Sequence, residues 1–150
     1  MTTMLIEGAY KFGDLRKRIA KLAGAAEQVA RESAEPIAEH IRTQWREGYG
    51  PAGRKWEELA ASTLKRNQPR RQQSPLLFTG AMFDSLTATV DGKQITFHVS
   101  PTYASFHQSG TSRMPARPIF PAAGAQVPPR WSAILRDAAK RAIEEATRAQ

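Results

Sequence analysis

The apolar residues of the first third of the chain lie on one side of a helix, and this pattern limits the possible folds more than any other feature. Five of them follow at alternating steps of four and three residues: Leu15, Ile19, Leu22, Ala26 and Val29. Such steps return to the same side of an α-helix. The same side resumes with Ile37, Ile41 and Trp45. The sequence therefore predicts amphipathic helices that pack one side against the rest of the protein.

Capping and breaking residues mark the ends of this helical region. Asp14 can accept the unpaired amide hydrogen bonds of a first turn, so the helix is expected to begin there. Pro36 cannot donate a hydrogen bond inside a helix. Either the helix kinks at Pro36, or a second helix begins with Ser33 as its cap. Gly48 and Gly50 are expected to end the region.

Two short segments in the second half of the chain alternate apolar with polar residues, which is typical of β-strands. The apolar residues are Leu86, Ala88 and Val90 in the first segment and Ile95, Phe97 and Val99 in the second. Asp91-Gly92 between them suits a two-residue type I′ turn, so a β-hairpin is expected. One face of this hairpin would pack on helices. The predicted fold class is therefore α+β, with amphipathic helices on a small antiparallel sheet.

The overall length and hydropathy fit one compact domain. A second amphipathic helix is expected after Pro128-Pro129, and 150 residues are enough for a single domain spanning residues 1–150. No run approaches the roughly 18 apolar residues of a membrane-spanning helix, and no signal peptide is visible. We therefore expect a protein assembled in a cytoplasm with no membrane partner. With no cysteine, disulfides and thiolate sites are excluded.

The positive charge is concentrated in two regions. The chain carries a net charge of +8, and the segment "KRNQPRRQQ" has four cations and no acid. From Gly92 to Arg136 there is also no Asp or Glu. Solvated surface, an acidic protein partner and nucleic-acid phosphates all remain open as explanations. We expect residues 65–75 to form a mobile basic loop that docks during assembly, with these cations: Lys65, Arg66, Arg70 and Arg71.

No arrangement of residues in the sequence predicts catalysis. His40, His98 and His107 lie on separate elements without metal-ligand spacing, and no acid lies near His107 in the sequence. Ser62 and Lys65 share the S-x-x-K spacing of some acyl-transfer enzymes but lack the companion motifs, so a helix cap is the better interpretation. The glycine-rich "GYGPAG" has no phosphate-binding G-K-[ST]. Neither an enzymatic activity nor a cofactor or metal is expected.

Three blocks follow one another along the chain: "GYGPAGRKWEELAASTLKR", "LLFTGAMFDSL" before the hairpin, and "YASFHQSGTSRMPARPIFP". In this order, behind an amphipathic helical region, they resemble the phage virion morphogenesis family, the tail-completion proteins of Mu-like contractile-tailed phages. The resemblance covers nearly the whole chain. The family pattern has a tryptophan after the first glycine-proline turn, and Trp56 matches it here. Independently of the resemblance, a large ring in a polar connection also predicts a core position for Trp56.

The resemblance implies a non-enzymatic structural protein of the virion, located in the tail or neck, that completes the tail or joins it to the head. It further implies a homo-oligomer in the form of a ring, contacts with other tail or neck proteins, and passage of DNA through the centre. The alternative from the charge is a basic nucleic-acid-binding module. Against this alternative, the sequence has no recognisable helix-turn-helix or RNA-binding signature.

The third block is expected to have two parts. In the first, Tyr103 and Phe106 place their rings in the core while His107 lies beside Phe106 near the rim, and Gly110 ends the turn in a left-handed conformation. In the second, prolines stiffen residues 111–130 into an extended arm that docks on a partner. The docking residues are Arg113, Met114, Arg117, Ile119 and Phe120. The alternative is an arm folded back on its own domain, with Met114 and Ile119 buried and the arginines in solvent.

Overall fold

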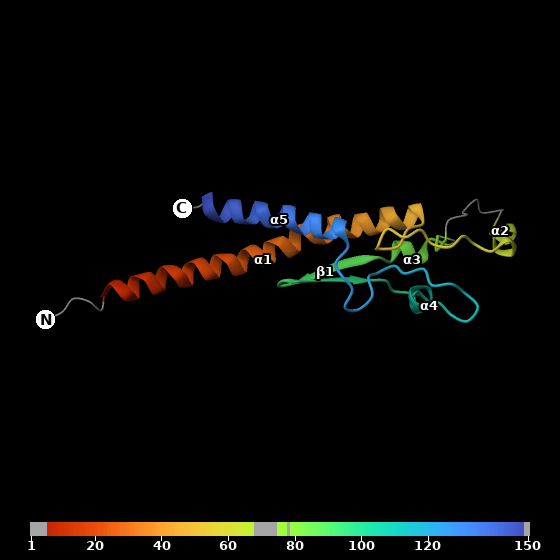
Figure 1. Ribbon diagram of the computed structural model, residues 1–150, viewed down its shortest axis with the longest axis horizontal. Coiled ribbons are helices and arrows are strands. Elements are labelled where there is room, and N and C mark those ends of the chain that lie inside the picture. The colour runs from red at the N-terminus through yellow and green to blue at the C-terminus, as the bar shows by residue number, and fades with distance from the viewer. Residues whose placement is uncertain (1–5, 68–74, 78, 149–150) are drawn as a thin grey trace.

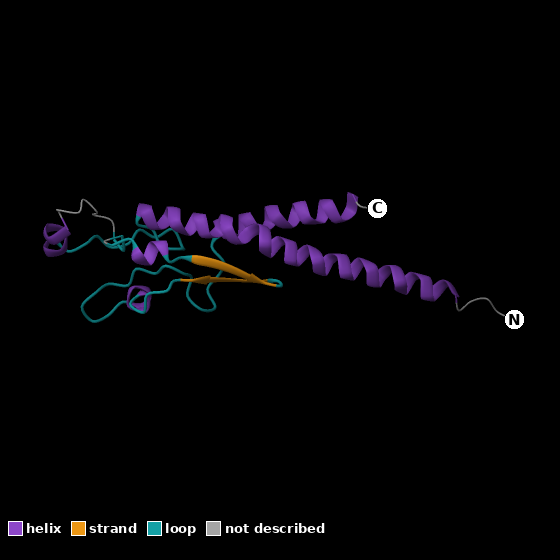
Figure 2. Cartoon of the chain, turned by 180° about the vertical axis from the view of Figure 1, so that it is seen from behind, coloured by secondary structure: helices purple, strands orange, loops and turns teal. Residues whose placement is uncertain are grey.

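The protein combines two long helices with one β-hairpin and short connecting helices, as shown by a computed structural model (Figures 1 and 2). The structure describes residues 6–67, 75–77 and 79–148. In chain order the elements are α1 (Ile6–Glu47), α2 (Ala61–Asn67), α3 (Ala81–Asp84), β1 (Thr87–Asp91), β2 (Gln94–His98), α4 (Ala104–Ser109) and α5 (Pro129–Arg148). The predicted α+β class with a small antiparallel sheet is confirmed.

The helical first third is one continuous helix of 42 residues. It begins at Ile6, so the expected start at Asp14 is wrong, and Pro36 lies inside it without starting a second helix. Pro36 is exposed, whereas Ile37 and Ile41 on the inner side are buried. The missing amide donor therefore affects the solvent side of α1 and leaves the packed side intact. As predicted, the helix ends at Gly48, which has a φ of 79°.

Helices α1 and α5 pack against each other as an antiparallel pair. Gln28 Nε2 donates to a Glu145 carboxylate oxygen at 2.7 Å, and one turn further Arg141 Nη2 lies 3.4 Å from a Glu32 oxygen. Small side chains on both helices are almost fully buried and allow close approach: Ala30, Ser33, Ala34 and Ala38 on α1, and Ala138 and Ala142 on α5. The closing amphipathic helix predicted from the sequence is thus present.

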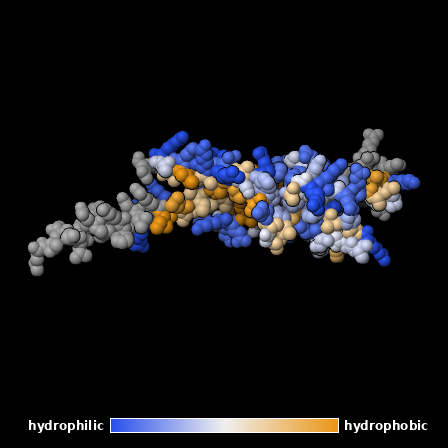
Figure 3. Space-filling model, viewed as in Figure 1, coloured by the Kyte–Doolittle hydropathy of each residue, from blue (hydrophilic) through white to orange (hydrophobic). Residues whose placement is uncertain are grey.

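The N-terminal half of α1 extends past the end of α5 (Figure 1). Since Gln28 is level with Glu145, Arg148 at the end of α5 lies within about one helical turn of that contact. Farther out, the side chains of Ile19 and Leu22 are 58% and 59% exposed. Figure 3 shows hydrophobic surface where α1 emerges beyond α5. The apolar stripe of α1 is therefore buried at Ile37, Ile41 and Trp45 and exposed at Ile19 and Leu22.

The hairpin packs on α1 with the predicted alternation of side chains. Its register pairs Asp91 with Gln94, so the connecting residues are Gly92 and Lys93 instead of the expected Asp91 and Gly92. Phe97 on the inner face lies 5.4 Å from the ring of Trp131 at the start of α5. Its neighbour His98 is exposed on the outer face, as expected.

The core lies beneath the C-terminal half of α1. Trp45 is 1% exposed and meets the ring of Phe83, in α3, at a centroid distance of 5.7 Å. The other buried members of this cluster lie on α1, α3 and α5 and in the segments between the elements: Ile37, Ile41, Trp56, Met82, Leu86, Val99, Ile119 and Trp131. None of the described helices is long and apolar enough to cross a membrane. The core fixes the loops that follow α1 and α4 beside each other.

Candidate functional site

The loop after α1 is held closed by backbone hydrogen bonds. Trp56 N donates to the carbonyl oxygen of Gly48 at 2.8 Å, and Tyr49 pairs with Lys55 in an isolated antiparallel bridge. Gly50 N donates to the carbonyl oxygen of Arg54 at 2.9 Å. The glycines permit this tight return of the chain. As a result Trp56 is turned into the core, where it is 6% exposed, as the sequence predicted.

The segment from Arg117 to Phe120 is bound along its backbone by α4. Arg117 N donates to the carbonyl oxygen of His107 at 2.7 Å. The side-chain amide of Gln108 accepts from Ile119 N at 2.9 Å and from Phe120 N at 3.1 Å, and it donates to the carbonyl oxygen of Phe120 at 2.8 Å. Gln108 thus pairs with this segment as a neighbouring strand would.

The Arg117 side chain ties the same segment to the loop after α1. Its Nε donates to the carbonyl oxygen of Glu57 at 3.0 Å, and its Nη2 donates to that of Glu58 at 3.1 Å. Arg117 is only 5% exposed. Burial lowers the pKa of the guanidinium, and the nearby Glu57 carboxylate acts in the opposite direction. An arginine remains charged under these conditions, so the fork places a buried cation here.

Gly110 makes the close approach of α4 to the following turn possible. Its φ is 74° and its ψ is 174°, a combination that is nearly exclusive to glycine and differs from the left-handed helical cap expected from the sequence. A Cβ atom at this position would lie 2.8 Å from Ala116 N. Beyond it, Thr111 pairs with Met114 in an isolated bridge. The prolines therefore follow a turn that returns to the domain.

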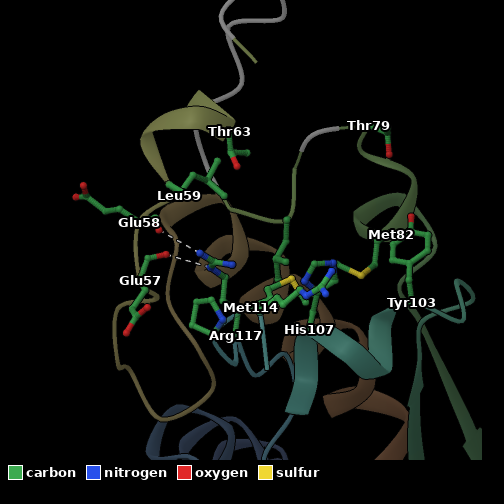
Figure 4. A pocket seen from close by; sticks show the side chains of 14 residues that line it. Glu57, Glu58, Leu59, Thr63, Thr79, Met82, Tyr103, His107, Met114 and Arg117 are labelled. Carbon is green, nitrogen blue, oxygen red and sulfur yellow. Dashed lines mark hydrogen bonds between the residues drawn. The ribbon is translucent and has the colours of Figure 1, made fainter. Parts of the chain in front are cut away.

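A cavity of about 660 Å³ opens where these segments meet. Its walls include four apolar side chains and two polar ones: Leu59, Leu76, Met82, Met114, His107 and Arg117 (Figure 4). The buried Nδ1 of His107 has no hydrogen-bond partner among the described residues. Burial, and next the positive charge of Arg117, lower the pKa of His107, so its ring is neutral at pH 7.

These segments are the blocks that carried the resemblance in the sequence, and the comparison with known families agrees. The profile of the phage virion morphogenesis family matches residues 11–150. The chain belongs to this family. A role in assembling a phage virion follows from that membership. No curated protein and no solved structure matches the chain significantly.

Within the family's third block, the structure places the anchoring residues differently from the prediction. Tyr103 is 42% exposed and Phe106 is 57% exposed, so neither ring enters the core. The side of α4 that faces inward instead carries Ala104, His107 and Gln108. The hydrogen bonds of His107 and Gln108 to the Arg117–Phe120 segment fix that side of α4. The prediction of two core rings is therefore wrong.

The expected docking arm is divided by the structure. Arg117 and Ile119 are 5% and 4% exposed, so for these two residues the outward arm is wrong. Phe120 is half-buried. The alternative of an arm folded back on its own domain describes Ile119, but its expectation of arginines in solvent is wrong for Arg117. Arg113 is exposed and Met114 is half-buried at the turn, and both line the cavity. Their docking role stays a prediction.

The expected basic loop lies mostly outside the described residues. Lys65 is exposed on α2, which also includes Arg66 and thus extends to Asn67 within the expected loop. Arg70 and Arg71 lie outside the described residues. Among the described residues, no group of His, Asp and Glu side chains could hold a metal ion.

Sequence reasoning missed Gln108 and the acceptor carbonyls of Glu57 and Glu58. Gln108 lies within the third block of the sequence, but no sequence pattern distinguishes a glutamine whose side chain binds backbone groups. The carbonyl acceptors are defined only by the course of the loop after α1. One signal was present in the sequence. Arg117 lies between Pro115 and Pro118 in a region without acidic residues, so the partners of its guanidinium must come from other parts of the fold.

Proposed function

We propose that the protein is a structural, non-enzymatic component that completes the phage tail or joins it to the head, and that it acts as a homo-oligomeric ring. Membership of the phage virion morphogenesis family supports the assembly role. The exposure of Ile19 and Leu22 on the α1 stripe supports self-association and is the observation that carries this part of the proposal. On this proposal the protein is located in the tail or neck of the virion.

The apolar stripe on α1 indicates a surface that another protein chain covers. Ile37 and Ile41 on the same side are 2% and 3% exposed because the rest of the chain covers them. Ile19 and Leu22 are more than half exposed on the part of α1 that extends past the end of α5 (Figure 1). Large apolar side chains repeated along a projecting helix are typical of an interaction surface.

Charge adds a proposal about the other partners. Exposed Arg16, Lys17 and Lys21 lie on the projecting half of α1, and the chain carries a net charge of +8. We propose acidic surfaces of other tail or neck proteins as their partners, together with DNA where it passes through the ring. Binding carried by phosphate contacts weakens steeply with salt, whereas docking through apolar surface does not. Salt dependence therefore separates this role from that of a nucleic-acid-binding module.

Deletion of the reading frame from a phage that carries it tests the function. The expected result in electron micrographs is an accumulation of unjoined heads and of tails with abnormal ends, and the intact chain supplied in trans restores complete virions. Purified wild-type tails should contain the protein at one end. Normal, infectious virions from the deletion phage would show that the proposed role is wrong.

A further inference from the structure

Arg117 is a buried cation without a carboxylate partner. Its Nε and Nη2 are bound by carbonyl oxygens, and no carboxylate of the described residues lies within 4.0 Å of the guanidinium. The carboxylates of Glu57 and Glu58 point away from the cavity in Figure 4, although their carbonyl groups hold the fork. Its Nη1 makes no hydrogen bond with the described part of the chain. Buried charges in proteins are usually paired, so the cavity offers an unused donor to an anion.

Two further groups add to this polar end of the cavity. His107 lines it and has a buried ring nitrogen without a hydrogen-bond partner among the residues described. Arg113 is exposed at its rim. The neutral imidazole can donate one hydrogen bond, and the rim arginine can add charge. An anion in the cavity would therefore meet donors from three side chains.

The remaining walls combine polar residues (Glu57, Glu58, Thr63, Thr79 and Tyr103) with a group of apolar side chains. Leu59, Leu76, Met82 and Met114 line the cavity, and Leu76 has a φ of 68°, a strained conformation for this residue type. Such strain often occurs at binding sites. A volume of about 660 Å³ is within the range of ligand sites and can hold one or two side chains of a peptide. Methionine side chains adapt easily to an incoming apolar group.

We propose that this cavity is a docking socket for a peptide segment of another virion protein that presents a carboxylate next to an apolar side chain. The carboxylate binds Arg117 Nη1, His107 and Arg113, and the apolar side chain enters between Leu59 and the methionines. A nucleic acid fits less well, because the apolar walls match no phosphate or ribose. The identity of the partner rests on the proposed function, whereas the chemistry of the socket does not.

The test uses the full chain and two small probes, N-acetyl-leucine and its uncharged analogue N-acetyl-leucinamide, at constant ionic strength. Nuclear magnetic resonance would follow the Nε–H signal of Arg117 and the ring signals of His107. We expect N-acetyl-leucine to shift both sets of signals to saturation. The amide should bind about tenfold more weakly, because it lacks the charge-assisted hydrogen bonds. Equal shifts by the two probes, or no shift at these residues, would overturn the proposal.

Two matched variants and one competitor complete the design. Arg113→Ala should weaken N-acetyl-leucine severalfold, whereas Arg136→Ala, an exposed arginine on α5 outside the cavity, should leave it unchanged. Inorganic phosphate that displaces the probe at equal concentration would identify a general anion site and contradict the proposal. The probes need no other virion protein. If they bind as expected while the deletion phage remains normal, the proposed function is wrong and the socket stands.

Discussion

Trp56 Nε1 donates a hydrogen bond to the carbonyl oxygen of Pro118 at 3.1 Å, across 62 positions of sequence. The contact joins the loop after α1 to the proline-rich segment after α4. A Cβ atom at Gly50 would lie 3.1 Å from Trp56 Nε1 and 3.2 Å from the Pro118 oxygen, so a side chain here would crowd both partners of this bond. Together with the Arg117 fork, it makes the two loops one unit.

Replacing Trp56 separates the hydrogen bond from the packing of the ring. Trp56→Phe keeps much of the buried surface and loses the donor, which should lower the free energy of unfolding by about 1–2 kcal/mol. Trp56→Ala also empties the core site and should cost about 3–5 kcal/mol. Urea unfolding followed by circular dichroism measures both. A Phe variant as stable as the wild type would mean that the bond contributes nothing.

The two arginines of the segment should behave in opposite ways. Arg117→Met leaves the carbonyl oxygens of Glu57 and Glu58 without their donors and should destabilise the protein by about 2–4 kcal/mol. Arg113→Met changes an exposed side chain and should stay within about 0.5 kcal/mol. The same unfolding measurement compares the pair. An equal decrease in the free energy of unfolding for both substitutions would show that the hydrogen bonds of Arg117 to Glu57 and Glu58 do not stabilise the protein.

Gly110 and Gly53 form a matched pair for the role of close backbone approach. Both have a positive φ, of 74° and 73°, but only at Gly110 would a Cβ atom meet backbone, at 2.8 Å from Ala116 N. Gly53→Ala should cost about 1 kcal/mol from backbone strain alone. Gly110→Ala must also push the turn away from α4, so its loss of stability should be clearly larger. Equal melting temperatures of the two variants would contradict this.

The pH dependence of stability follows from two histidines. Burial lowers the pKa of both His107 and His40 in the folded protein, with nearby arginine charge as the second cause. Below about pH 6.5 the unfolded chain therefore binds more protons than the folded one, and stability falls as the pH falls. Above that pH both states are neutral at these rings, and the contribution is complete. His107→Gln should reduce this slope between pH 6.5 and 5, whereas His98→Gln, at an exposed position, serves as control.

The elements with a regular repeat could be predicted from the sequence. Steps of four and three residues identified α1 and the closing helix, and alternation with Asp91-Gly92 identified the hairpin to within one residue of its turn. Trp56 was correctly predicted to lie in the core, because burying its large ring stabilises an otherwise polar connection. Pro36 misled because its effect depends on whether it lies on the solvent side of the helix.

The candidate site could not be predicted in the same way, because its contacts are long-range and use backbone atoms. In a helix as short as α4, periodicity cannot decide whether Phe106 or its neighbours His107 and Gln108 face inward. The hydrogen bonds of Gln108 and of the His107 carbonyl to the Arg117–Phe120 segment decide it. The burial of Arg117 likewise depends on two carbonyl groups about 60 residues away.

The last prediction concerns self-association through the exposed half of the α1 stripe. Ile19 and Leu22 are 58% and 59% exposed in the single chain, so Ile19→Ser with Leu22→Ser should leave its melting temperature unchanged. If a second copy covers these side chains, the double variant loses apolar burial of about 1.5–3 kcal/mol per side chain. The oligomer should then dissociate at a protein concentration about a hundredfold higher than for the wild type, or more.

Sedimentation over a concentration series measures this shift, and a matched variant controls for it. Lys17→Ser with Lys21→Ser changes two exposed positions on the opposite side of the same helix and should leave the association intact. If the lysine variant dissociates as readily as the apolar one, charge instead of the stripe holds the copies together. If the wild type stays monomeric at high concentration and isolated tails lack the protein, the ring itself is ruled out. Association that survives both double variants would place the contact between copies elsewhere on the chain.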